Sequence, residues 1–283
     1  MIRIALPNKG RLAEETRELL SDAGLPVRSN DRVLTAKLGD DFQALFVRAQ
    51  DIPEFVADGA ADAGVTGWDL VAESGRDLES LLDLSFGACR LVVAVREESA
   101  VTSVAELAAG TRVATVFPGI TRRFFAERGI PVELVPMSGA VEVAPHLGIA
   151  DVVVDITSTG STLKTNGLRE VETVLRSTAH VVARAGRTAP SPQLDELVAA
   201  LESVLRARGK RYLMANVPRR ALDQVREVVP GLNGPTVIDI MDGGVFVAVH
   251  AVVPAAAIYK TIAALKALGA EGILVTRIER LMP

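Results

Sequence analysis

The amino-acid sequence predicts an α/β protein that ends in a separate ferredoxin-like domain. Over the first 210 residues, short stretches rich in β-branched residues alternate with helical stretches, which is typical of an α/β fold. From residue 211 onward the order becomes β-α-β-β-α-β, which is that of the ferredoxin-like split unit. This last segment holds about 70 residues, enough for a small domain of its own.

The spacing of apolar residues locates the individual elements. Leu194, Leu197 and Leu201 recur at helical spacing, whereas three successive valines at 152–154 are typical of a strand covered on both faces. We therefore expect strands at 2–6, 44–47, 63–66, 91–95, 112–116, 132–135, 151–156 and 180–185, and helices at 11–23, 121–128, 141–147 and 194–208. In the C-terminal segment we expect strands at 212–217, 236–240, 245–253 and 273–278, and helices at 221–229 and 255–268.

The composition disfavours several classes of protein. Hydrophobic residues make up 49% of the 283 residues and charged residues 23%, as in an ordinary globular protein. No apolar run approaches the roughly 20 residues that span a bilayer, and the N-terminus lacks the layout of a signal peptide. We therefore expect a cytoplasmic protein without a membrane partner. The net charge of -4 and the 4% aromatic content disfavour nucleic-acid binding.

Side chains that commonly bind metals are sparse. The one cysteine, Cys89, excludes an internal disulfide and a cysteine-based zinc cluster. The histidines, His146, His180 and His250, lie far apart and show no paired spacing on a helix, so we interpret them as structural. Metal-dependent hydrolysis is therefore not the favoured chemistry.

The strongest chemical signal lies at residues 151–163, where a buried strand ends in Asp155 and small hydroxyl residues surround Gly160. Such a turn directs backbone N–H and hydroxyl groups to one point, which suits a phosphate dianion. It is not a Walker P-loop, because no Gly-Lys-Ser/Thr triplet is present. Asp155 would accept hydrogen bonds from ribose hydroxyls, although a well-capped turn without a ligand is the alternative. The residues expected at the phosphate are Thr157, Ser158, Thr159, Gly160, Ser161 and Thr162.

Two further segments place charged residues where strands end. Lys9 and Arg11 follow the first strand at the carboxyl edge of the sheet, where open α/β folds bind ligands, and they could neutralise a polyphosphate. The alternative is a solvated turn. Arg48 and Asp69 follow later strands, and Asp69 is expected to accept a hydrogen bond from a ligand.

These segments together resemble the ATP phosphoribosyltransferase family, which joins ATP to phosphoribosyl pyrophosphate in the first step of histidine biosynthesis. The resemblance covers essentially the whole chain, and residues 211–283 are similar to the regulatory domain of the long form. Ser161 is a mild departure, because several relatives carry threonine or alanine there. The matching motifs are Leu6-Pro-Asn-Lys-Gly-Arg-Leu12, Asp51-Ile-Pro-Glu-Phe-Val56, Ala61-Asp-Ala-Gly-Val-Thr-Gly-Trp-Asp69 and Ser138-Gly-Ala-Val-Glu142 with the segment that follows it to Leu163.

The resemblance implies a two-lobed core like the type II periplasmic binding proteins, with the active site between the lobes, and an ACT-like C-terminal domain. Lobe I would comprise residues 1–89 and 182–210, lobe II residues 90–181, and the regulatory domain residues 211–283. More familiar phosphoribosyltransferases place two adjacent acids before the loop. Here Val154 precedes Asp155, so one acid is available, which favours the different fold.

The implied reaction is attack by N1 of ATP on the anomeric carbon of phosphoribosyl pyrophosphate, with Mg²⁺ as the cofactor at the leaving pyrophosphate. No strong general base is needed, since N1 offers a lone pair. The family further implies a homo-oligomer, from dimer to hexamer, that histidine inhibits. The implied catalytic residues are Lys9, Arg11, Arg48, Asp69, Glu142 and Asp155. The implied histidine-site residues are Asn216, Leu232, Thr236 and Gly272.

Two other functions compete with this interpretation. A two-lobed solute-binding or effector-sensing module would share the lobes but would need no phosphate loop, and a periplasmic binder would need an export signal. An orotate- or purine-type phosphoribosyltransferase is disfavoured by the single acid before the loop.

Overall fold

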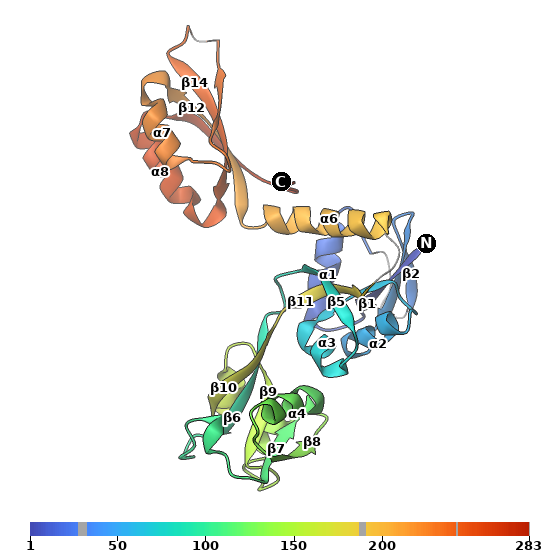
Figure 1. Cartoon of the computed structure of the whole chain (residues 1–283). Coiled ribbons are helices and arrows are strands. Elements are labelled where there is room, and N and C mark those ends of the chain that lie inside the picture. The colour runs from blue at the N-terminus through green and yellow to red at the C-terminus, as the bar shows by residue number, and fades with distance from the viewer. Residues whose placement is uncertain (28–32, 187–190, 242, 283) are drawn as a thin grey trace. The chain divides into compact units, whose positions relative to one another are not determined.

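The computed structural model describes residues 1–27, 33–186, 191–241 and 243–282 (Figure 1). The chain divides into two compact units, Met1–Val198 and Ala199–Pro283, each with its own sheets and helices. None of the helices in these ranges combines the length and the apolar character that crossing a membrane requires.

The first sheet of the N-terminal unit contains β1 (Ile2–Pro7), β2 (Thr35–Leu38), β3 (Phe42–Val47), β4 (Ala63–Gly67), β5 (Leu78–Asp83) and β11 (Ala179–Arg184). Its strand order is β2-β3-β1-β4-β11-β5. Strand β1 runs parallel to β3 and β4, whereas β11 is antiparallel to β4 and β5. We call this sheet lobe I, together with its helices α1 (Arg11–Asp22), α2 (Ile52–Ala57) and α3 (Trp68–Ser74).

The second sheet contains β6 (Cys89–Arg96), β7 (Thr111–Thr115), β8 (Val132–Pro136), β9 (Val152–Thr157) and β10 (Leu168–Ser177). Its strand order is β10-β6-β9-β7-β8. The side chains of β9 alternate between two apolar clusters, so both faces of this strand are covered. We call this sheet lobe II, together with its helices α4 (Pro118–Glu127) and α5 (Ser161–Thr165).

The chain passes between the two sheets twice, once from β5 to β6 and once from β10 to β11. Because β11 returns to the first sheet and lies between β4 and β5, lobe I is assembled from two separate stretches of sequence. Two α/β lobes with these strand orders and two crossings form the periplasmic-binding-protein-like core. The predicted fold class is therefore confirmed.

Helices α3 and α4 tie the lobes together. The carboxylate of Glu73 on α3 accepts hydrogen bonds of 2.8 Å from the backbone N–H groups of Gly119 and Ile120, in the first turn of α4. Arg123 of α4 in turn donates to the carbonyl of Ala72. The first N–H groups of a helix lack acceptors within the helix, so Glu73 caps α4 from the other lobe. We call these contacts the α3–α4 latch.

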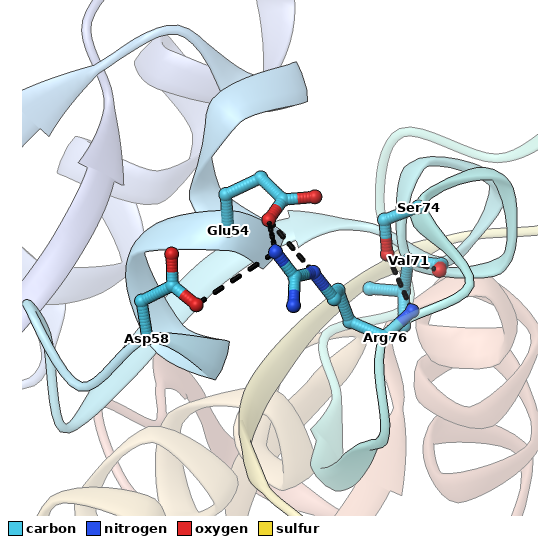
Figure 2. A network of polar contacts seen from close by, with 5 residues as sticks. All are labelled: Glu54, Asp58, Val71, Ser74 and Arg76. Atoms are coloured by element: carbon cyan, nitrogen blue, oxygen red, sulfur yellow. Dashed lines mark hydrogen bonds and ion pairs between the residues drawn. The ribbon is translucent and has the colours of Figure 1, made fainter.

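A network of ion pairs on the surface of lobe I links α2 to the end of α3 (Figure 2). Arg76 donates to Glu54 at 2.7 Å and lies 3.7 Å from Asp58. Its backbone N–H donates to Ser74 Oγ, which itself donates to the Val71 carbonyl at 2.7 Å. The Arg76 and Glu54 side chains are 44% and 46% exposed, so solvent screens the pair and its contribution to stability is small.

The C-terminal unit contains β12 (Lys210–Pro218), β13 (Thr236–Asp239), β14 (Phe246–Pro254) and β15 (Glu271–Arg277), with helices α7 (Leu222–Val228) and α8 (Ile258–Ala267). The sheet order is β13-β14-β12-β15, and every pairing between these strands is antiparallel. Val225 of α7 and Leu265 of α8 are buried in one cluster with alternate residues of β12 and β14. The predicted β-α-β-β-α-β order is confirmed. Helix α6 (Pro192–Ala207) runs across the boundary between the two units.

Some expected elements differ from the structure. The helix expected at 141–147 is only a 3-10 turn at Val141–Val143, because Pro145 cannot donate a backbone hydrogen bond and Ala140 and Gly148 have positive φ. Strands β2, β5 and β10 were not expected. Each is an edge strand, so much of its surface is solvated and its sequence carries a weak apolar pattern.

Candidate functional site

The expected site residues of lobe I lie where β1 and β3 end side by side. Pro7 pairs with Val47, and the backbone N–H of Asn8 donates to the Val47 carbonyl at 2.8 Å. Lys9 and Arg48 therefore leave the sheet at the same edge, and both side chains are exposed. The parallel register thus brings together two cations that lie 39 residues apart in the sequence.

The turn between β1 and α1 requires a glycine, since Gly10 has a φ of +82°. Arg11 begins α1, and its Nε donates to Glu15 Oε1 at 3.0 Å along the exposed face of the helix. Asn8 keeps its buried Oδ1 without a hydrogen-bond partner among the described residues, so this oxygen could accept a bond from a ligand or water. Sequence reasoning did not single out Asn8.

The expected phosphate loop is anchored at both ends and open between them. Thr157 and Leu163 are buried, and Thr157 Oγ1 accepts a 2.8 Å hydrogen bond from the Gly160 N–H. Gly160 has a φ of +79°, and Thr159 and Ser161 share a hydrogen bond of 2.8 Å between their hydroxyls. Helix α5 has only five residues, so its dipole is small. Binding of an anion at this turn would depend mainly on its backbone and hydroxyl groups. The exposed residues of the loop are Ser158, Thr159, Ser161 and Thr162.

Asp155 and Glu142 form an acidic pair beside this loop. Burial raises the pKa of the Asp155 carboxyl above its usual value. A hydrogen bond from the Ile156 backbone N–H opposes that rise, while the negative charge of Glu142 adds to it. Glu142 belongs to the turn that follows Ala140, a residue held at a φ of +52° although it is not glycine. Such strain outside glycine is concentrated at functional sites in proteins.

Asp69, which is expected to accept a hydrogen bond from a ligand, accepts one from a protein hydroxyl in this structure. It is 7% exposed, its Oδ1 accepts a 2.6 Å hydrogen bond from Ser177 Oγ, and its backbone N–H donates to the same oxygen at 2.9 Å. Ser177 ends β10 of lobe II, and Asp69 lies in the first turn of α3 of lobe I. Through this hydrogen bond the carboxylate joins the lobes at a crossing.

A cavity of about 630 Å³ lies beside this crossing and reaches the phosphate loop at Ser158. Trp68 and His180 line it with their ring centroids 5.0 Å apart. Burial lowers the pKa of His180, and the charge of Asp83 opposes this effect. Burial also raises the pKa of the Cys89 thiol, so the thiolate is disfavoured. Arg90 and Arg176 also line this cavity, and Arg90 is paired with Glu170.

The expected histidine-site residues lie in the C-terminal unit. A Cβ built on Gly272 would lie 3.5 Å from Asn216 Nδ2, so these two residues are adjacent. Asn216 pairs with Ala248 and Thr236 pairs with His250, which directs Asn216 and Thr236 to one face of the sheet, the face away from α7 and α8. Leu232 lies in the turn before β13 and is 55% exposed.

The carboxylates near the loop are oxygen ligands of the kind that magnesium prefers. No group of three or more His, Cys, Asp or Glu side chains in the described ranges is arranged to hold a metal. Magnesium is, however, usually bound by one or two carboxylates together with substrate phosphates, and Glu142 and Asp155 offer such oxygens.

Comparison with known proteins connects these features to one family. The ATP phosphoribosyltransferase family matches residues 48–203, and the family described as HisG, C-terminal domain, matches residues 207–280. The chain is 69% identical to the ATP phosphoribosyltransferase of Gemmatimonas aurantiaca and 51% identical to that of Methanosarcina acetivorans, with both proteins of each pair fully covered. A solved ATP phosphoribosyl transferase (HisG:HisZ) complex from Thermotoga maritima superposes with a TM-score of 0.65 at 28% identity, covering 73% of this chain and 99% of that one.

Proposed function

This chain belongs to the ATP phosphoribosyltransferase family, and we propose that its loop at 157–162 holds the 5-phosphate of phosphoribosyl pyrophosphate. It is a pentosyltransferase of histidine biosynthesis in the long form, because the C-terminal domain is matched as well as the catalytic part. The observation that carries the proposal is the loop itself. Its exposed hydroxyl residues lie between two buried anchors, two residues after a half-buried acid.

Asp155 holds the sugar in this proposal. Its carboxylate accepts from the 2- and 3-hydroxyls of the ribose while Ser158 and Thr162 contact the phosphate. Fixing the sugar at both ends holds the anomeric carbon in place for attack and avoids the entropic cost of an encounter in solution. As the bond to pyrophosphate breaks, positive charge develops at the anomeric carbon, and the nearby Glu142 and Asp155 carboxylates stabilise it.

The cations of lobe I face the polyphosphate groups. Lys9 and Arg48 leave the sheet at one edge, so their charges act on the same anion, and Arg11 adds a third charge at the start of α1. Glu142 and Asp155 would hold magnesium together with the substrate phosphates, where it would supply positive charge to the leaving pyrophosphate. N1 of ATP attacks with its own lone pair, so no general base from the protein is assigned.

We assign the catalytic work to residues 1–210, which include both lobes, and regulation to residues 211–283. Histidine binds the sheet face that carries Asn216 and Thr236, with Gly272 giving room beside Asn216 and Leu232 giving apolar contact. The enzyme is proposed to be cytoplasmic, to assemble as a homo-oligomer between dimer and hexamer, and to lose activity when histidine binds.

The function is tested by mixing the purified protein with ATP, Mg²⁺ and phosphoribosyl pyrophosphate and following the ultraviolet change of N1-alkylated adenine. Release of pyrophosphate in equal amount supports the proposed transfer. A two-lobed binding module would bind one of these ligands without turnover, and that result would reject the proposed enzyme.

A further inference from the structure

An ion pair that the reaction does not use lies directly beside the phosphate loop. Arg90 of β6 donates two hydrogen bonds to Glu170 of β10, from Nη1 to Oε2 at 2.6 Å and from Nη2 to Oε1 at 2.9 Å. The hydrogen bond from Arg90 to Glu170 also raises the pKa of the guanidinium. A bidentate pair of this kind fixes the orientation of both side chains. The side chains are only 26% and 30% exposed.

Both members of the pair adjoin the loop. Glu170 Oε1 would lie 3.1 Å from a Cβ built on Gly160, so the carboxylate occupies the space that any side chain at this position would need. Arg90 pairs in register with Thr157, which places the two side chains next to each other on one face of the sheet. Thr157 Oγ1 in turn accepts from the Gly160 N–H. The pair therefore adjoins the loop at its first residue and at its glycine.

An irregularity in β10 directs Glu170 to this face. Glu170 pairs with Ala94 but Glu172 pairs with Val93, so the register shifts between the two glutamates. In a regular strand, residues two apart share a face, whereas the bulge sends these two to opposite faces of the sheet. Glu172 consequently meets Arg128 at the end of α4, at 2.9 Å, away from the loop.

We propose that Glu170 and Arg90 are positioning residues that hold the loop in the shape that receives the phosphate. Glu170 packs against the left-handed turn at Gly160, and Arg90 fixes the Glu170 carboxylate there. The loop's N–H groups then keep their directions before the substrate arrives, which lowers the ordering cost of binding. This inference rests on the proposed role of the loop in binding phosphoribosyl pyrophosphate.

The test compares Glu170→Gln and Arg90→Ala with the matched control Glu172→Gln. The control changes a glutamate of the same strand that pairs with an arginine at similar exposure on the opposite face. We expect KM for phosphoribosyl pyrophosphate to rise roughly tenfold in the Glu170 and Arg90 variants, as for one lost charge-assisted hydrogen bond. KM for ATP should stay within about twofold, because only the phosphate loop is displaced. Calorimetric titration with ribose 5-phosphate should show the same loss without turnover.

A double-mutant cycle separates positioning from simple destabilisation. If Arg90 acts through Glu170, the double variant Arg90→Ala/Glu170→Gln should bind ribose 5-phosphate no more weakly than the worse single variant. If Glu170→Gln and Arg90→Ala change the affinity for ribose 5-phosphate no more than Glu172→Gln does, the proposal is overturned. Asp155→Ala and Thr162→Ala are measured in parallel. If they lose affinity and Glu170→Gln does not, the positioning role is wrong, whereas unchanged affinity in all of these variants rejects the role of the loop itself.

Discussion

The α3–α4 latch should contribute measurably to the stability of the N-terminal unit. Glu73→Ala removes a carboxylate that accepts two backbone hydrogen bonds of 2.8 Å and leaves the N–H groups of Gly119 and Ile120 without this acceptor. Bonds to a charged group, together with the capping of a helix N-terminus, are worth about 1.5–3 kcal/mol in a half-buried position. For a unit of 198 residues, each kcal/mol shifts Tm by about 2–4 °C, so we expect a decrease of roughly 3–12 °C.

The measurement is thermal unfolding followed by circular dichroism, with Glu54→Ala as the control. Glu54 is also a glutamate on a lobe I helix, but its partner is the exposed Arg76 of Figure 2, and such pairs contribute about 0–1 kcal/mol. Gly119→Ala tests the same contact from the other side, because its Cβ would lie 2.9 Å from the Glu73 carbonyl oxygen. If Glu73→Ala and Glu54→Ala unfold at the same temperature, the latch does not stabilise the unit.

Three further predictions concern the proposed sites. Asp155→Asn should lower kcat/KM for phosphoribosyl pyrophosphate about ten- to a hundredfold, the loss of a charge-assisted hydrogen bond. Because burial raises the pKa of Asp155, its ionised form disfavours folding. The wild type should therefore gain stability relative to this variant as the pH falls through that pKa. Chemical unfolding at several pH values should show the free energy of unfolding of the wild type, minus that of the variant, increasing towards low pH. Lys9→Ala and Arg11→Ala should raise the KM of a polyphosphate substrate by a factor that shrinks with added salt. If both variants have the wild-type KM at every salt concentration, Lys9 and Arg11 belong to a solvated turn and do not bind the substrate. Thr236→Ala should weaken inhibition in a titration of activity with L-histidine, and an unchanged inhibition curve would remove Thr236 from the histidine site.

Elements with a strong apolar period could be predicted from the sequence, whereas the contacts between distant segments could not. The valines of β9 and the leucines of α6 mark their elements without help from other segments. Strand β10 has charged residues on both faces, because its bulge sends Glu170 and Glu172 in opposite directions. The sequence of β10 therefore lacks the alternation of a regular strand, and the structure was needed to place Glu170 and Glu172 in one strand.

The environment of a candidate residue was equally hidden from the sequence. The motif around Asp69 resembles that of its family, but the partner of its carboxylate is Ser177, 108 residues further along the chain. Glu73 and Gly119 likewise lie in segments with no shared pattern. Asp155 could be found because its strand, its hydroxyl-rich loop and its glycine are contiguous. A site whose residues are contiguous can be predicted from the sequence, whereas a contact between residues of two lobes cannot.

The late insertion of β11 into the first sheet affects how the chain can fold as it leaves the ribosome. Strand β5 pairs only with β11 among the described strands, and β4 has β11 as its second neighbour. Until residue 184 has been synthesised, β4 keeps an unpaired edge and β5 has no partner in the sheet. All strands of lobe II have been synthesised by residue 177. We therefore expect lobe II to fold before β11 completes the sheet of lobe I. A nascent chain stalled between residues 177 and 184 would expose the unpaired edge of β4 to other proteins. A chaperone that covers this edge would prevent aggregation most effectively during that interval.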